Sequence, residues 1–136
     1  MKKINCILLV DDNASDNAYH KIIIETVGIC NHIKIATDGQ KALDYLLKAF
    51  EPNPEESYPI PDLIFLDINM PRMNGYEFLD EYKKFKEKVG KIIMIVMLTT
   101  SSNPDDRTKS LEKNVKEFLI KPLTGLKLQE IIDQNF

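Results

Sequence analysis

The sequence contains few of the residues that build disulfides, thiolate metal sites or glycine-rich loops. Its two cysteines, Cys6 and Cys30, stand 24 residues apart and form no CxxC pair. We therefore expect two unpaired thiols, as is common in a reducing cytosol. The five glycines are never spaced as GxGxxG or GxxxxGK, which excludes the common glycine-rich nucleotide cradles.

Long apolar runs and an excess of one charge are also missing. The longest apolar run, Ile92–Leu98, has seven residues, far short of the ~18 that suggest a membrane span. No small-residue cleavage site follows the apolar stretch that stops at Asp11, so a secretory signal is not expected. A net charge of −3 excludes a strongly basic nucleic-acid clamp. We expect a cytoplasmic protein that contacts neither a membrane nor nucleic acid directly.

The length and composition are those of one globular domain. The chain has 136 residues, of which 43% are hydrophobic and 29% charged, and a chain of this size holds a core without disulfides or a structural metal. We expect one domain over residues 1–136 with no attached output domain. Phe50–Pro61 holds four prolines and three glutamates, which predicts an irregular surface loop.

Short apolar runs alternate with helix-like segments along the chain. The runs predict strands at Ile4–Val10, Ile33–Ala36, Leu63–Leu66, Ile92–Leu98 and Phe118–Ile120. The gaps predict helices at about 14–27, 40–49 and 76–88, and two more that begin near Asn103-Pro104 and Thr124. In the first helix we expect a buried stripe of Ala14, Ala18, Ile22 and Ile23.

The spacing of the runs predicts a parallel sheet. The runs end 22 to 32 residues apart, which suits a strand, a crossover helix and its two loops. Their continuous apolarity indicates strands that are covered on both faces. We predict an α/β fold of the flavodoxin-like (βα)5 type, a doubly wound sheet of five parallel strands in the order 2-1-3-4-5 with helices on both faces.

Polar residues follow four of the five predicted strands. Asp11-Asp12 follow the first, Asp67 the third, Thr99 the fourth and Lys121 the fifth. Because ligands of open α/β sheets bind outside the carboxyl ends of the strands, we expect these residues to share one crevice. Each acid taken singly also fits a helix cap or a turn, as Asp12 does, but the coincidence of all of them favours a site.

The residue types of this crevice suit phosphoryl transfer. Carboxylates held together repel one another, and oxygen ligands without His or Cys favour Mg²⁺ as the neutralising ion. Lys121 adds an ammonium and Thr99 a hydroxyl, which stabilise a phosphoryl group in transfer. An aspartate can itself be the nucleophile.

Five motifs in order resemble the response-regulator receiver domain of two-component signalling, the CheY-like family. They are Val10-Asp11-Asp12-Asn13, Leu66-Asp67-Ile68-Asn69-Met70-Pro71, Asn74-Gly75, Met97-Leu98-Thr99-Thr100 and Phe118-Leu119-Ile120-Lys121-Pro122-Leu123. The resemblance spans nearly the whole chain. It implies a phosphorelay signalling phosphoprotein in which Asp67 accepts a phosphoryl group from a histidine kinase or a histidine phosphotransfer protein.

The resemblance also implies the metal ligands. Asp12 and Asp67 would bind Mg²⁺ directly together with the backbone carbonyl of Asn69, and Asp11 would act mainly through water. Lys121 would contact the phosphoryl group. The Lys121-Pro122 bond is expected to be cis on the resemblance alone.

The switch implied by the resemblance runs through Thr99 and Phe118. Thr99 would close onto the phosphoryl group and Phe118 would enter the space it leaves. The surface of the fourth helix, the fifth strand and the fifth helix would change shape and contact a downstream protein. The Phe50–Pro61 loop is similar to that of single-domain regulators paired with bacterial phytochromes, which implies a possible homodimer.

Other functions use parts of the same pattern. A phosphatase of the haloacid dehalogenase type needs a second acid two residues after its nucleophile, where Asn13 stands after Asp11. A flavin module needs a Ser/Thr-rich loop after the first strand, and a degenerate receiver would lack part of the acid, threonine and lysine set. We expect a phosphoacceptor with intrinsic autophosphorylation and autodephosphorylation rather than a conventional enzyme.

Overall fold

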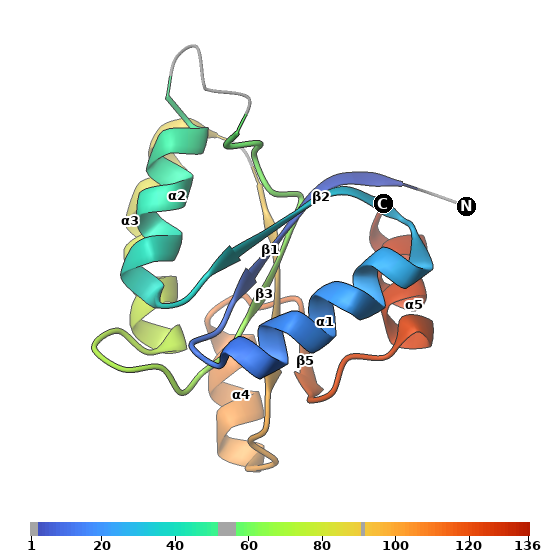
Figure 1. Cartoon of the computed structure of the whole chain (residues 1–136). Coiled ribbons are helices and arrows are strands. Elements are labelled where there is room, and N and C mark those ends of the chain that lie inside the picture. Colours follow the sequence, from blue (N-terminus) through green and yellow to red (C-terminus); the bar gives the residue numbers. More distant parts are fainter. Residues whose placement is uncertain (1–2, 52–56, 91) are drawn as a thin grey trace.

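The computed structural model describes residues 3–51, 57–90 and 92–136, so the middle of the Phe50–Pro61 segment lies outside the described residues. In the described part, five strands and five helices alternate along the chain (Figure 1). The strands are β1 (Ile4–Val10), β2 (Cys30–Ala36), β3 (Leu63–Leu66), β4 (Met94–Thr99) and β5 (Glu117–Ile120). The helices are α1 (Ala14–Val27), α2 (Gly39–Ala49), α3 (Gly75–Val89), α4 (Pro104–Glu112) and α5 (Gly125–Asn135). None of these helices is long and apolar enough to cross a membrane.

The strands form one parallel sheet in the order β2-β1-β3-β4-β5, which confirms the predicted doubly wound fold. Four strand boundaries differ from the prediction: the starts of β2, β4 and β5, and the end of β4, which runs to Thr99. β4 begins at Met94, because Ile92 lies before the strand and is 90% exposed. β2 begins at Cys30, three residues before the predicted start, because backbone pairing with β1 extends through the polar residues Asn31 and His32 of this edge strand.

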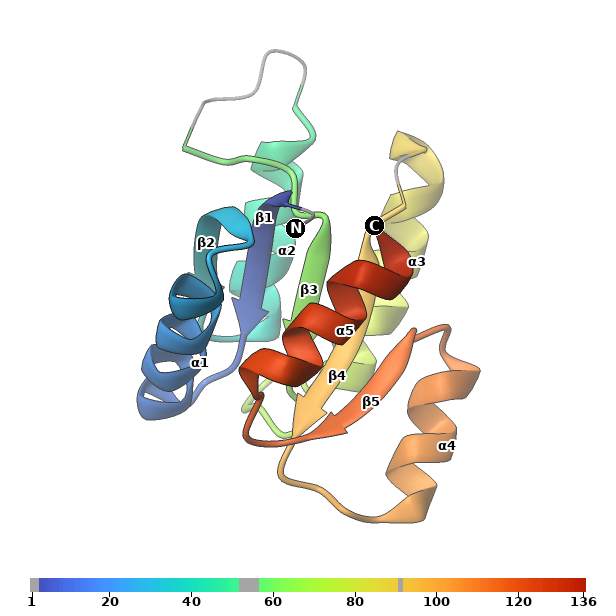
Figure 2. The ribbon, with the colours of Figure 1, turned by 90° about the vertical axis from the view of Figure 1, so that its right-hand side faces the viewer.

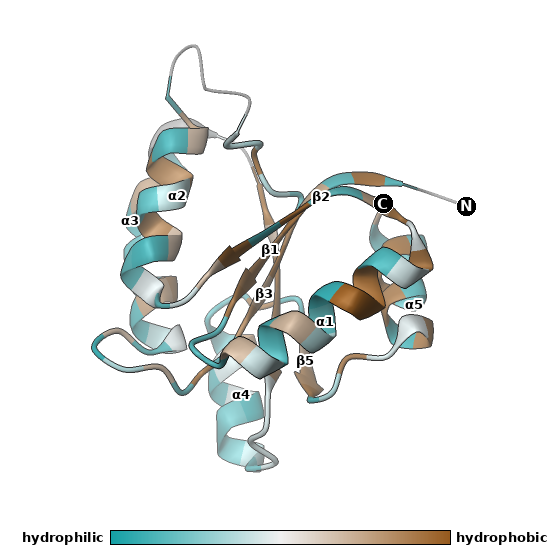
Figure 3. Cartoon of the chain, in the orientation of Figure 1, coloured by the Kyte–Doolittle hydropathy of each residue, from teal (hydrophilic) through white to brown (hydrophobic). Residues whose placement is uncertain are grey.

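The helices cover both faces of the sheet. Figures 1 and 2 show α1 and α5 on one side and α2 and α3 on the other, with α4 beside the edge strand β5. Each face carries its own apolar cluster, and the central strands β1 and β3 between them are mainly hydrophobic (Figure 3). This two-sided burial explains why the central strands read as continuous apolar runs.

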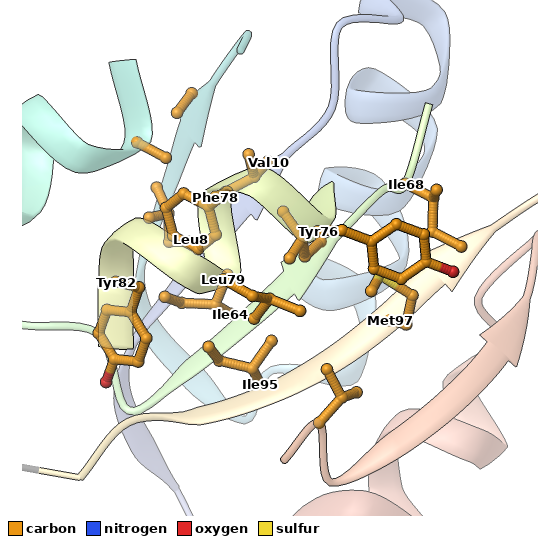
Figure 4. Packing of buried hydrophobic residues seen from close by; sticks show 14 of the residues in the cluster. Leu8, Val10, Ile64, Ile68, Tyr76, Phe78, Leu79, Tyr82, Ile95 and Met97 are labelled. Atoms are coloured by element: carbon orange, nitrogen blue, oxygen red, sulfur yellow. The ribbon is translucent and has the colours of Figure 1, made fainter. Parts of the chain in front are cut away.

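The α2–α3 side holds the larger cluster. Phe78, Leu79 and Tyr82 project from α3 toward the sheet, where Leu8 and Ile64 lie (Figure 4). Phe78 is fully buried, and its ring stacks on that of Tyr82 with a centroid separation of 6.1 Å.

The buried face of α1 differs from the predicted apolar stripe. Its buried residues are Asn17, His20 and Ile24, whereas Ile22 is 60% exposed. Asn17 Nδ2 donates to the carbonyl oxygen of Asp11 at 2.9 Å, and His20 Nε2 accepts from the backbone N–H of Leu123 at 3.3 Å. The predicted apolar stripe was wrong because these two polar side chains form hydrogen bonds to the loops that follow β1 and β5. Hydrophobic periodicity contains no information about such hydrogen bonds.

Every described helix begins with a side-chain cap. Asn13, Asp38, Asn74, Asn103 and Thr124 each accept a hydrogen bond from a backbone N–H in the first turn. The caps fix where each chain segment turns after leaving the sheet. The loops at the carboxyl ends of the strands are therefore held at both ends.

Gly75 permits a close approach between α3 and the chain leaving β3. A Cβ at this position would lie 2.5 Å from the carbonyl oxygen of Asp67 and 3.0 Å from the Cα of Ile68. Helix propensity alone favours alanine over glycine by ~1 kcal/mol. We nevertheless expect Gly75→Ala to lower the free energy of unfolding by about 2–3 kcal/mol, because rigid backbone blocks the added methyl group. Urea unfolding measures this change.

Gly39→Ala is the matched control, since the three atoms nearest to its Cβ would all belong to the side chain of Met73, with a shortest distance of 2.8 Å. We expect a smaller loss there than at Gly75. Equal urea midpoints for Gly75→Ala and the wild type would contradict the close approach.

Candidate functional site

The parallel register brings the polar residues that follow the strands to one edge of the sheet. Val10 pairs with Leu66, so Asp11 and Asp67 leave neighbouring strands at the same level. The backbone N–H of Asp67 donates to the carbonyl oxygen of Val10 at 3.0 Å. On the other side, Thr99 pairs with Ile120, and Lys121 comes directly after it. The residues that follow the strands therefore meet at one edge of the sheet, as the strand order predicted.

Three carboxylates converge at this edge. One oxygen from each of Asp11, Asp12 and Asp67 lies within 4.8 Å of the others. Asp11 and Asp67 are buried and Asp12 is exposed. Asp11 Oδ1 accepts from the backbone N–H of Asn13 at 2.9 Å, which fixes the carboxylate at the start of α1. The cluster is thus buried at Asp11 and Asp67 and open to solvent at Asp12.

Lys121 neutralises this cluster from the β5 side. Its Nζ lies 2.5 Å from Asp11 Oδ2, 2.7 Å from Asp16 Oδ2 and 3.3 Å from Asp67 Oδ2. Burial alone would lower the pKa of Lys121, but its hydrogen bonds to Asp11 and Asp16 outweigh burial and raise that pKa above its ordinary value. The lysine therefore stays charged across the whole physiological range.

The pKa of Asp11 is also raised, but here the main cause is burial. Burial raises its pKa, and the neighbouring Asp67 charge adds to that rise, while hydrogen bonds from Lys121 and from the backbone of Asn13 oppose it. The net direction is upward. A buried carboxylate with a raised pKa beside other carboxylates is a group that gains from a bound cation.

Asp16 belongs to the site and was missed in the sequence. It lies in the first turn of α1, where an acid is ordinarily explained by the positive end of the helix dipole. Its side chain is 35% exposed and points to Lys121 rather than only to solvent. Spacing within the sequence gives no signal of this contact, because the two residues lie 105 positions apart.

Thr99 is placed at the end of β4 and is fully buried. Its Oγ1 accepts from the backbone N–H of Ser101 at 3.3 Å. Ser101 Oγ in turn donates to Asp106 Oδ2 at 2.6 Å, and Tyr76 Oη donates to Asp106 Oδ1 at 2.8 Å. A hydrogen-bonded chain thus leads from Thr99 to the first turns of α4 and α3.

Asp106 was also missed as a functional residue. The sequence explains it as an acid at the start of a helix, but hydrogen bonds from Ser101 and Tyr76 hold its pKa below the ordinary value. An ionised Asp106 can accept from both hydroxyls at once. It therefore fixes the loop between β4 and α4 in its present position.

The remaining predicted residues lie around this centre. Phe118 is buried on β5 within the α2–α3 side cluster. The Lys121-Pro122 bond is cis, as the resemblance implied. Asn69 lies two residues after Asp67 in the loop before α3 and is exposed. Its carbonyl as a metal ligand stays a prediction.

The chain is similar to known proteins both in sequence and in fold. The family model of the response regulator receiver domain matches residues 7–133. Response regulator Rcp1 from Synechocystis sp. is 37% identical over 115 residues, which cover 85% of this chain and 75% of Rcp1. A two-component response regulator from Cytophaga hutchinsonii superposes with a TM-score of 0.86 at 28% identity, covering 98% of this chain and 97% of that one. The Mn²⁺-bound form of Rcp1 superposes with a TM-score of 0.70 at 33% identity, covering 95% and 89%.

Proposed function

Because the chain belongs to the response regulator receiver domain family, we propose that Asp67 is the residue that accepts a phosphoryl group from a histidine kinase or a histidine phosphotransfer protein. The observation that carries this proposal is the convergence of Asp11, Asp12 and Asp67 on one point with Lys121 against them. The chain acts as a phosphoacceptor and not as a conventional enzyme.

The carboxylate of Asp67 is oriented by two contacts. Its Oδ1 accepts from the backbone N–H of Ile68 at 2.8 Å, and its Oδ2 faces Lys121. In the transfer, one carboxylate oxygen of Asp67 forms a bond to phosphorus while the bond from phosphorus to the donor breaks. The electron pair of that bond leaves with the donor group. Lys121 stabilises the negative charge on the phosphoryl oxygens.

The carboxylate cluster fits a divalent cation. Asp11, Asp12 and Asp67 offer oxygen ligands on a side that is open at Asp12, a donor set that suits Mg²⁺. Asp12, Asp67 and the carbonyl of Asn69 would hold the ion directly, and Asp11 would hold it through water. A bound Mg²⁺ would offset the charge of the carboxylates and of the incoming phosphoryl group.

The proposed switch starts from the hydrogen bond between Thr99 and Ser101. A phosphoryl group on Asp67 brings nearly two negative charges and strong acceptor oxygens. The Thr99 hydroxyl turns toward them and gives up the N–H of Ser101, and Phe118 enters the space that Thr99 leaves. The loop held by Ser101 and Asp106 moves with it, so that the surface of α4, β5 and α5 is presented to a downstream protein or to a second copy in a homodimer.

Labelling with a small phosphoryl donor tests the acceptor. Wild-type protein incubated with acetyl phosphate and Mg²⁺ should gain one phosphoryl group by intact mass, and Asp67→Ala should gain none. Asp105→Ala, which removes an exposed carboxylate of α4, should label like the wild type. Equal labelling of Asp67→Ala and wild type would place the acceptor elsewhere and overturn the proposal.

A further inference from the structure

The ammonium of Lys121 is shared unevenly among the carboxylates around it. Its Nζ is 2.5 Å from Asp11 and 2.7 Å from Asp16, but 3.3 Å from Asp67. The lysine that would bind the phosphoryl group is therefore held more closely by two other acids than by the acceptor. Of those two, Asp11 belongs to the carboxylate cluster, whereas Asp16 does not.

We propose that Asp16 is a positioning residue that restrains phosphorylation by holding part of the Lys121 ammonium away from Asp67. The inference rests on the proposed role of Asp67 as acceptor. Asp16 touches neither the acceptor nor the donor in this scheme and acts through Lys121. It sets how much of the positive charge is free for a phosphoryl oxygen.

The charges around Lys121 explain why Asp16 should slow phosphorylation rather than speed it. A cation bound at the cluster would engage the oxygens of Asp11 and Asp67 and would leave Asp16 as a full negative partner of Lys121. An incoming phosphoryl group then shares the positive charge and the three N–H donors of the ammonium with Asp16, so less of both is left for the phosphoryl oxygens. Asp16 also adds a negative charge beside the path of an anionic donor, which slows the approach of that donor.

The same contact affects the metal in the opposite sense. Asp16 shares the positive charge of Lys121 with Asp11 and Asp67, so the oxygens of these two residues are less neutralised. Without Asp16, Lys121 would pair more fully with them and would compete with Mg²⁺. Removing Asp16 is therefore expected to weaken metal binding and to speed phosphoryl transfer, two effects that a general loss of folding would not produce together.

Asp16→Asn tests this inference because it removes the charge and keeps the shape. The Asp16 backbone N–H that donates to Asn13 is unaffected. At saturating Mg²⁺, the rate of phosphorylation by acetyl phosphate, followed by intact mass, should rise about two- to five-fold, the range expected for one partly exposed ion pair. The Mg²⁺ dissociation constant, measured by titration calorimetry without donor, should rise about two- to five-fold.

Two controls separate charge from structure. Asp16→Glu keeps the negative charge and should behave like the wild type in both measurements. Glu25→Gln removes an exposed carboxylate near the other end of the same helix and should change neither.

The outcomes distinguish the two proposals. If the wild type takes up a phosphoryl group and Asp16→Asn takes it up no faster, the restraint by Asp16 is wrong and the role of Asp67 stands. A slower Asp16→Asn, or an unchanged Mg²⁺ affinity, overturns the restraint equally. If the wild type takes up no phosphoryl group, the role of Asp67 falls and the restraint falls with it.

Discussion

Lys121→Met should lower the free energy of unfolding by about 3–5 kcal/mol at pH 7, the range for removing one partner of a buried ion pair. The side chain of Lys121 is 7% exposed and contacts three carboxylates in the described structure. Methionine fills a similar volume but leaves Asp11 and Asp67 buried together without a cation. The loss comes from their mutual repulsion and desolvation rather than from lost packing.

The loss of stability in Lys121→Met should become smaller as the pH falls below 7. The pKa of Lys121 is raised, so its stabilising contribution is complete below the ordinary value of 10.5 and disappears only as the pH rises through the higher folded value. In the variant, Asp11 loses a partner that lowers its already raised pKa. Protonation of Asp11 then favours the folded state, so the deficit of the variant should shrink as the pH falls from 7 into the range where Asp11 takes up a proton.

Urea unfolding followed by circular dichroism measures this effect, since the chain has no tryptophan. Excess Mg²⁺ should restore part of the stability of Lys121→Met, because a cation at the cluster replaces the lost charge. Lys84→Met, which removes an exposed lysine paired with Glu81, should change stability by less than about 1 kcal/mol. A Lys121→Met protein as stable as the wild type at pH 7 would show that the carboxylates do not need the lysine.

Phe78→Ala should also cost about 3–5 kcal/mol, through a cavity rather than through charge. Phe78 is fully buried, stacks on Tyr82 and lies between α3 and the sheet (Figure 4). The loss should be independent of pH between about 5 and 8 and unaffected by Mg²⁺, in contrast to Lys121→Met, since no titratable group changes its partner.

The urea midpoint and the slope of the transition test this second prediction. A lower midpoint with an unchanged slope indicates lost stability without a change in the surface exposed on unfolding. Leu47→Ala is the control, because Leu47 is 52% exposed on α2 and its truncation should stay within about 0.5–1 kcal/mol. If both variants lose the same amount, the cluster under α3 does not carry the stability that its burial indicates.

Local sequence determined most of the secondary structure and the sheet. The apolar runs predicted five parallel strands covered on both faces, because a strand buried on both sides has no polar positions to alternate with. The same pattern set boundaries less well. Ile92 continues the apolar run but is exposed before β4, and Cys30 joins β2 through backbone pairing that side-chain hydropathy does not reflect.

The α1 face shows where periodicity fails. Its buried Asn17 and His20 satisfy backbone groups of the loops after β1 and β5, so polar residues took the place of an apolar stripe. Gly75 is a second position at which a rule based on local sequence gives the wrong expectation. Helix propensity favours alanine there, and only the nearness of the Asp67 carbonyl reverses the sign.

The amino-acid sequence by itself determined the order of elements and the carboxylate, threonine and lysine residues at the ends of the strands, because chain order fixes which residue comes after each strand. The tertiary structure alone decided how those groups share their charges. Asp16 became a partner of Lys121, and Asp106 became the acceptor for Tyr76, through contacts between elements that are distant in sequence. Such contacts depend on distances of a few ångströms between side chains, and residue spacing along a chain does not encode those distances.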